Sequence, residues 1–148
     1  MARGDLTLFE EFADQLGEEG HNFASDTLKL GIIDNTTAPT AADETPAWAD
    51  YSENEVGTGG GYVAGGIALT GVTWAEVSGV GTLDDSGNIS LAQNGSGFTD
   101  GYWGVLYNDT NATDMAIAYL DLGGPVSEQA GPININWSAS GILTVTIT

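Results

Sequence analysis

The chain has no cysteine, one histidine (His21) and only two basic residues, Arg3 and Lys29, among its 148 residues. Without cysteine it can form neither a disulfide nor a thiolate metal site, so its stability must come from packing. Two basic residues cannot supply the several contacts that binding to nucleic-acid phosphates requires. No apolar run approaches the roughly 20 residues needed to span a bilayer. The sequence therefore predicts neither a nucleic-acid partner nor a membrane segment.

Acidic residues are in large excess: 21 Asp and Glu residues give a formal net charge of -19. Such self-repulsion keeps a protein soluble at high copy number but opposes compaction unless salt screens it, over about 10 Å at 0.1 M. We therefore expect a saline medium, bound cations or a positively charged partner; the alternative is an acidic surface that only prevents aggregation. The hydrophobic fraction of 41% is typical of a globular chain, and the length predicts a single domain over residues 1–148.

Two segments lack a strand pattern. Thr7 and Glu10 fit a capping box, and Phe9, Phe12 and Leu16 would share one helical face, so we expect a short helix over about residues 8–16. Residues 38–61 combine two prolines, several acidic residues and a glycine-rich tract at 57–61, without lasting periodicity. We expect a long irregular loop there. It is a candidate contact arm, because loops of this length tend to be functional or disordered.

The rest of the chain is typical of short strands separated by turns. The predicted strands are residues 28–33, 63–70, 72–78, 81–84, 88–92, 102–108, 115–122, 133–138 and 142–148. The last two alternate apolar and polar residues and predict a hairpin with one buried face. Residues 102–107 and 115–120 are apolar on both faces, as in central strands that are covered on each side or that meet a partner. We predict an all-β fold: an antiparallel two-sheet β-sandwich, jelly-roll-like or immunoglobulin-like, with one short N-terminal helix.

The sequence offers little chemistry. We expect His21, the only side chain with an ordinary pKa near neutrality, to be an exposed loop histidine. No serine lies in a G-x-S-x-G elbow. Carboxylate pairs of the glycosidase kind are abundant by chance in so acidic a chain and identify no site, so an acidic hydrolase is the least favoured function. We predict no enzyme, no catalytic residues and no cofactor.

Metal binding is weakly signalled as well. Residues 84–88 (DDSGN) predict a tight turn between strands, because their glycine is at the wrong position for an EF-hand loop. The candidate ligands for a structural divalent cation are the loop carboxylates Asp43, Glu44, Asp50, Glu53 and Glu55. Their spacing alone does not identify a set of ligands. The glycines of residues 57–61 have no lysine or helix after them, so we expect flexible or close-packed backbone rather than phosphate binding.

The layout of the chain resembles that of small structural proteins of tailed-bacteriophage virions, of the capsid decoration (cement) type. The segments that carry the resemblance are LFEEF (8–12), SDTLKL (25–30), the loop 37–50, GGGYVAGG (59–66), VLYNDT (105–110), IAYLDLG (117–123) and NWSASGIL (136–143). The resemblance implies a component present in many copies on the outer surface of the capsid. It implies no catalytic residues.

From this resemblance we expect a decoration protein that binds the major capsid protein, stabilises the capsid and self-associates, as a trimer at local symmetry axes. Aromatic anchors dominate interface energetics, so the contact candidates are Phe9, Phe12, Trp48 and Tyr51. The alternative is that these four side chains simply close the sandwich. The alternative function is a receptor- or glycan-binding module of a tail or head fibre.

Overall fold

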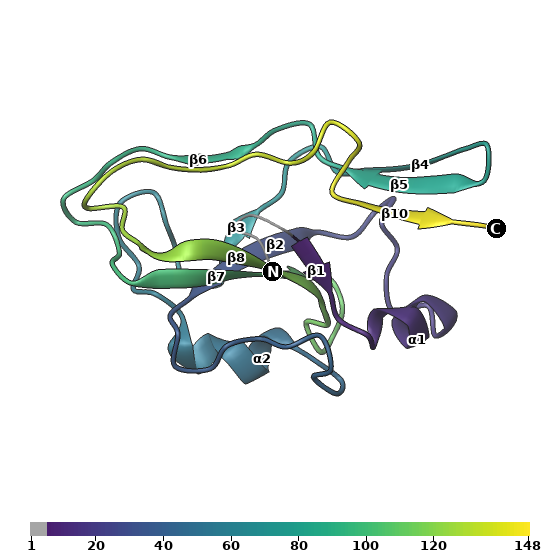
Figure 1. Cartoon of the computed structure of the whole chain (residues 1–148), viewed down its shortest axis with the longest axis horizontal. Helices are drawn as coiled ribbons and strands as arrows, with labels where there is room; N and C mark the ends of the chain where they lie inside the picture. The colour runs from purple at the N-terminus through teal and green to yellow at the C-terminus, as the bar shows by residue number, and fades with distance from the viewer. Residues whose placement is uncertain (1–5) are drawn as a thin grey trace.

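The computed structural model describes residues 6–148, which form ten strands, two short α-helices and one 3-10 helix (Figure 1). The elements are β1 (Leu6–Leu8), α1 (Phe12–Gly17), β2 (Leu28–Ile33), α2 (Trp48–Tyr51), η1 (Ser52–Asn54), β3 (Ile67–Ala68), β4 (Thr73–Val77), β5 (Val80–Asp84), β6 (Ile89–Leu91), β7 (Gly101–Asn108), β8 (Ala116–Val126), β9 (Ile133–Ile135) and β10 (Leu143–Thr146). All strand pairs are antiparallel, so the predicted all-β, sandwich-like fold is confirmed.

The central sheet has five strands in the order β1-β8-β7-β2-β3. Its middle is the β7–β8 hairpin, in which Leu106 lies opposite Ala118. On the other side of β7, Leu30 lies opposite that same Leu106. These strands are apolar on both faces because both faces are covered, one by a second layer of strands and the other by residues 38–61.

The second layer consists of a three-stranded sheet, β10-β5-β4, and a two-stranded sheet, β6-β9. The predicted hairpin between residues 133–138 and 142–148 is wrong. Ile133 pairs with Leu91 and Leu143 pairs with Leu83, so β9 and β10 run on in one direction along β6 and β5. The alternation of apolar residues correctly predicts that Ile133, Ile135 and Leu143 are buried, whereas Ile147 is 80% exposed. Alternation carries no information about the partner strand.

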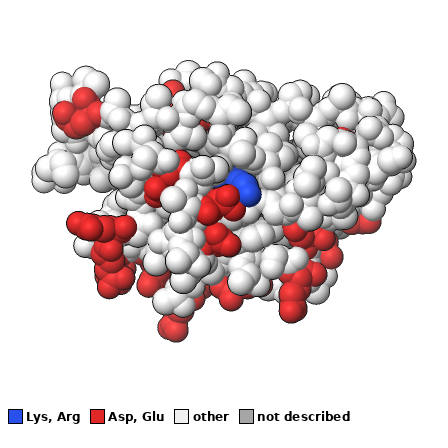
Figure 2. Space-filling view, turned by 180° about the vertical axis from the view of Figure 1, so that it is seen from behind, with Lys and Arg blue, Asp and Glu red and all other residues white. Residues whose placement is uncertain are grey.

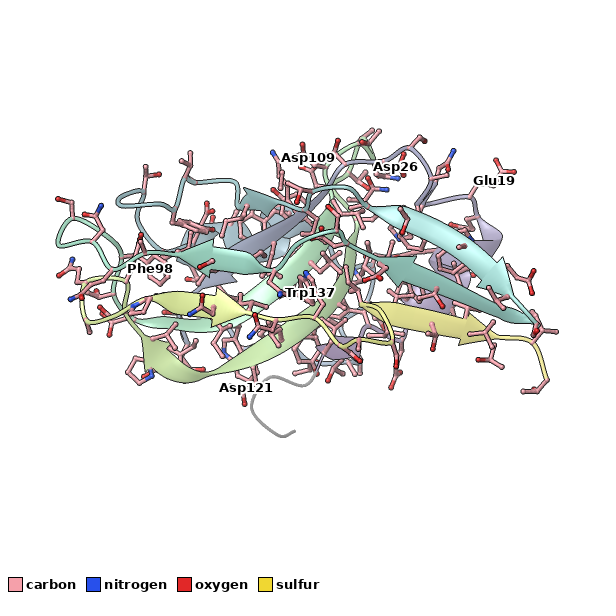
Figure 3. All side chains as sticks on the ribbon, turned by 90° about the horizontal axis from the view of Figure 1, so that it is seen from above. Glu19, Asp26, Phe98, Asp109, Asp121 and Trp137 are labelled. Carbon is pink, nitrogen blue, oxygen red and sulfur yellow. The ribbon has the colours of Figure 1, made fainter. Side chains whose placement is uncertain are left out.

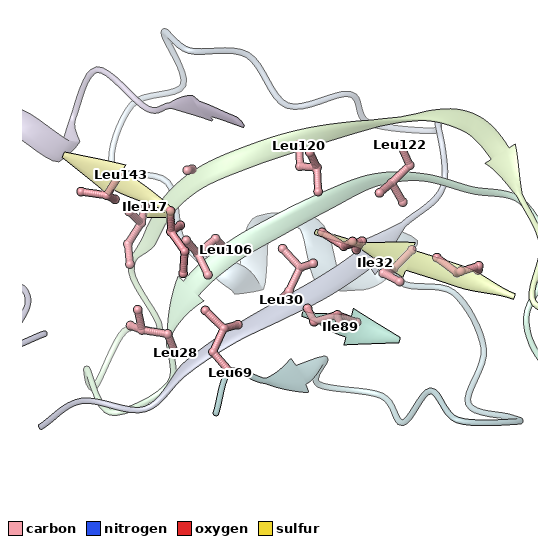
Figure 4. Close-up of a cluster of buried hydrophobic side chains, with 14 of the residues drawn as sticks. Leu28, Leu30, Ile32, Leu69, Ile89, Leu106, Ile117, Leu120, Leu122 and Leu143 are labelled. Atoms are coloured by element: carbon pink, nitrogen blue, oxygen red, sulfur yellow. The ribbon is translucent and has the colours of Figure 1, made fainter. Parts of the chain in front are cut away.

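The main core fills the space between the two layers (Figure 4). Leu28, Leu30 and Ile32 project from one face of β2 into this core, where all three are fully buried. Leu83 and Leu143 close it from the second layer. The strict alternation along β2 therefore dictates which of its side chains meet the second layer.

A second aromatic cluster lies on the opposite face of the central sheet. We call residues 38–61 the covering loop, because their helix α2 lies beneath the sheet (Figure 1) and brings Trp48 and Tyr51 against it. The Trp48 ring stacks on Tyr107, with 5.0 Å between centroids and 2° between planes. Gly31 makes room for this ring, since a Cβ atom at that position would lie 2.2 Å from it.

The N-terminal helix is shorter than predicted, and the capping box is wrong. Thr7 lies in β1, opposite Tyr119, and α1 starts only at Phe12 without a side-chain cap. Phe9 and Phe12 belong to different core clusters, and Leu16 is exposed. The edge of β8 offers main-chain hydrogen bonds and burial to residues 6–8, which outweighs the local preference for a helix.

Candidate functional site

The four aromatic side chains predicted as partner contacts lie inside the fold. Their exposed fractions are 1% for Phe9, 4% for Phe12, 7% for Trp48 and 3% for Tyr51. Phe9 stacks on Tyr51 at 6.0 Å between centroids, so the start of the chain and the covering loop meet on one face of the sheet. This burial favours the alternative in which the aromatic residues close the sandwich.

His21 is half-buried, contrary to the expected exposed histidine. Its ring packs against both Phe12 and Phe23, at 5.8 and 5.4 Å between centroids, and the two phenylalanine rings are 6.2 Å from each other. Nε2 is 2.7 Å from Oε1 of Gln15 and Nδ1 is 3.1 Å from Nδ2 of Asn108. Because an amide NH2 can only donate, Nδ1 is the acceptor and Nε2 carries the proton. Burial lowers the pKa of His21, and neither ring nitrogen remains free to act as a base.

Asn108 anchors this network although nothing in the sequence distinguishes it. It is fully buried, and its Nδ2 donates to Oδ2 of Asp26 at 2.7 Å. Its Oδ1 accepts the main-chain N–H groups of Thr110 and Asn111 and so shapes the β7–β8 turn. The arrangement holds the turn against the loop that follows α1.

The carboxylates proposed as cation ligands make separate local contacts. Asp43 accepts hydrogen bonds from the Thr40 hydroxyl at 2.5 Å, from the Thr40 main chain at 3.0 Å and from the Tyr51 hydroxyl at 2.7 Å. Burial alone would raise the pKa of Asp43, but these hydrogen bonds outweigh it and hold that pKa below its usual value. Glu55 accepts from the Tyr62 hydroxyl at 2.6 Å, in another part of the covering loop. Among residues 6–148, no three His, Asp or Glu side chains gather in a way that could hold a metal ion.

Residues 84–88 form the predicted turn between β5 and β6. Oδ1 of Asp85 accepts the Gly87 N–H at 2.9 Å, which is an Asx turn. These side-chain oxygens therefore stabilise the turn.

Glu128 is a buried carboxylate that the sequence analysis missed. It is fully buried, and its Oε1 accepts the Gly61 N–H at 2.6 Å, while Oε2 has no hydrogen-bond partner. A Cβ atom at Gly60 would lie 2.4 Å from this carboxylate, and one at Gly97 would lie 2.6 Å from it. The glycine-rich tract is thus close-packed backbone around Glu128. A glutamate in a polar loop carries no sequence signal for such burial.

An open groove of about 540 Å³ lies between β8 and β9. Its polar lining is Asp121, Ser127, Asn134 and Asn136, and it contains no aromatic, basic or histidine side chain. Oδ1 of Asp121, the only carboxylate in the lining, accepts the Gly123 N–H at 2.7 Å. A lone carboxylate cannot form the acid and base pair of a glycosidase, and the lining offers no ring on which a sugar could stack.

Charge is distributed unevenly over the molecule. Residues 10–55 hold more than half of the acidic residues, whereas residues 69–99 and 127–148, which include the strands of the second layer, hold only Glu76, Asp84, Asp85 and the buried Glu128. Figure 2 shows the carboxylates gathered on the side where α1 and α2 lie, with few on the opposite side. Lys29 and Asp109 make an ion pair at 2.9 Å. The protein therefore has one acidic side and one nearly uncharged side.

The uncharged side includes the outer surface of the β10-β5-β4 sheet. Leu83 and Leu143 point into the core, so their neighbours in each strand point outward. We call this surface the neutral face; its side chains are Thr73, Ala75, Val77, Val80, Thr82, Asp84, Thr144 and Thr146. It is rich in β-branched residues and carries a single carboxylate, Asp84 at the end of β5, although it belongs to a chain with a net charge of -19.

No helix in the described part of the chain is long and apolar enough to cross a membrane. No family model matches this chain, and neither the curated proteins nor the solved structures contain a match to it.

Proposed function

We propose that this chain is a non-enzymatic structural protein of a tailed-phage virion, which decorates the outside of the capsid and stabilises it by binding the major capsid protein. The observation that carries the proposal is the separation of charge between the two sides of the molecule (Figure 2). A decoration protein needs one surface that lies against the shell and another that tolerates solvent. The neutral face suits the first role, because charged groups are costly to bury at an interface without partners.

The acidic side suits an outer position. Its carboxylates repel packaged DNA, and with only two basic residues in the chain the protein would not be drawn to nucleic acid during assembly. The groove between β8 and β9 and the engaged His21 offer no convergent acid, base and nucleophile, which supports a mechanical role. Each bound copy would add interface area across neighbouring capsomers and so resist the pressure of the packaged DNA.

The proposal is tested by cryo-EM of particles of a phage that encodes the chain, after mass spectrometry has shown that the chain is present. We expect copies on the outer surface, with the neutral face against the major capsid protein. Copies that line the DNA-facing surface would refute the proposal, as would particles that lack the chain.

Deletion of the gene separates decoration from the alternative role in adsorption. Particles without the protein should release DNA at a lower temperature and adsorb normally, and the unaltered chain added back should restore stability. Loss of adsorption with intact capsid stability would instead support a receptor- or glycan-binding module.

A further inference from the structure

The edge of the three-stranded sheet at β4 (Thr73–Val77) differs from every other sheet edge described in residues 6–148. All five residues of β4 are exposed, on both faces of the strand. Figures 1 and 3 show the β4–β5 hairpin running out beyond the end of the central sheet. The hairpin therefore presents a strand that lacks a neighbour on one side.

The other edges are short or irregular, as is usual where proteins avoid edge-to-edge pairing. In the central sheet β3 has two residues and β1 has three. The part of β8 that β1 does not cover, residues 121–126, has a register shift in its pairing with β7 and includes Pro125, which has no N–H. In the second layer β6 and β9 have three residues each and β10 has four. Strand β4 is five residues long, regular, and without proline or lysine.

The hydrogen-bond pattern identifies which groups β4 leaves free. The Gly79 carbonyl accepts from the Ile147 N–H, so the odd-numbered residues of β5 face β10 and the even-numbered residues face β4. Since Thr82 lies opposite Ala75, the main-chain groups of Ala75 point toward β5. Those of Trp74 and Glu76 then point outward, to the free edge.

The free edge is complementary to itself. We propose that β4 pairs antiparallel with β4 of a second copy of this chain, about a two-fold axis at Ala75, joining two three-stranded sheets into one of six strands. In this register Trp74 lies opposite Glu76 of the other copy, and the outward N–H and C=O groups of both residues are satisfied. The two Ala75 residues form the close pair that does not exchange hydrogen bonds, where a small side chain fits.

The charge distribution allows a second copy of the chain to approach at the β4 edge. Copies with a net charge of -19 repel each other, so they can approach only where charge is sparse. The β4 edge carries one carboxylate, Glu76, which accepts the Gly79 N–H of its own turn at 2.5 Å and does not face its counterpart in the proposed register. Val77, at the end of β4, is an exposed apolar side chain, 71% accessible. Pairing would cover part of this surface.

Pairing at β4 is a property of the isolated chain and does not depend on a role in a virion. The test is sedimentation velocity of the purified full-length chain up to millimolar concentration, at low salt and at about 0.5 M salt, where screening shortens the range of repulsion to a few ångströms. We expect a monomer of 15.2 kDa that forms dimers, with the dimer fraction rising with salt. A chain that stays monomeric throughout would overturn the inference.

Two substitutions that change the net charge in opposite directions test the pairing. Ala75→Glu places like charges directly opposite each other, and Glu76→Pro removes an outward N–H group together with a negative charge. Both should raise the dimer dissociation constant severalfold or more, and circular dichroism should show that each variant folds. A shared effect cannot come from net charge, because the two changes move it in opposite directions.

Thr144→Glu is the matched control. Thr144 lies in the same row of the neutral face as Ala75 but two strands away. The Thr144→Glu variant gains the same charge as Ala75→Glu, away from the proposed contact, and should dimerise like the unaltered chain. Equal weakening by Thr144→Glu and Ala75→Glu would overturn the inference. So would a trimer that Thr144→Glu alone disrupts, because the contact would then involve β10.

Discussion

Replacing Trp48 with alanine tests whether the covering loop is part of the fold. Trp48 is 7% exposed, stacks on Tyr107 and lies over Gly31, so its removal would leave a cavity beneath the central sheet. Truncation of a buried aromatic residue to alanine costs about 3–5 kcal/mol, a large part of the roughly 5–15 kcal/mol that stabilises a domain. For a chain of this length, that loss lowers the melting temperature by about 6–20 °C.

The assay is urea unfolding followed by tryptophan fluorescence and circular dichroism, with Val63→Ala as an exposed control. Val63 is 63% exposed, so the control should change the free energy of unfolding by no more than about 0.5 kcal/mol. A loss below about 1 kcal/mol for Trp48→Ala would refute the assignment of the covering loop to the core and would return Trp48 to the candidates for partner contact.

A double-mutant cycle examines the contact itself. Gly31→Ala places a Cβ atom 2.2 Å from the Trp48 ring and should destabilise the protein by about 1–3 kcal/mol through overpacking. In the double variant the ring is absent and the added methyl group has space. The double variant should therefore lose less stability than the sum of the two single variants, and additive losses would mean that the two residues do not touch.

Two further predictions concern buried polar groups. Burial lowers the pKa of His21 in the folded protein below the ordinary value of 6.5, so the unfolded chain binds a proton more readily than the folded one. The contribution of neutral His21 to the free energy of unfolding should therefore be complete above pH 6.5 and decrease as the pH falls below that value. NMR titration of this single histidine checks the pKa, and the loss between neutral and mildly acidic pH should be smaller in His21→Phe; an equal loss in both proteins would contradict the assignment. Glu128→Ala removes the acceptor of the Gly61 N–H and should cost about 1–3 kcal/mol. Hydrogen exchange at Gly61 should accelerate in this variant, and unchanged exchange would mean that the carboxylate does not hold the glycine-rich tract.

The sequence by itself determined the class of fold and the burial of individual strand faces. Alternation from Leu28 to Ile33 is a local property, because successive side chains of a strand point to opposite faces whatever the partner. The continuous apolar run of residues 102–107 indicated a strand that is covered on both faces or meets a partner, and in the structure β7 contributes to the cores on both faces of the sheet. The large excess of acidic residues and the lack of cysteine follow from the composition alone.

Only the tertiary structure decided which segments meet. The pairing of Ile133 with Leu91 joins residues far apart in the chain, and no periodicity encodes it. The same holds for Glu128 surrounded by glycines, for His21 packed against two phenylalanines and for the exposed edge at β4. Each arises because packing in three dimensions combines surfaces from distant segments, and that combination separates an acidic side from a neutral one.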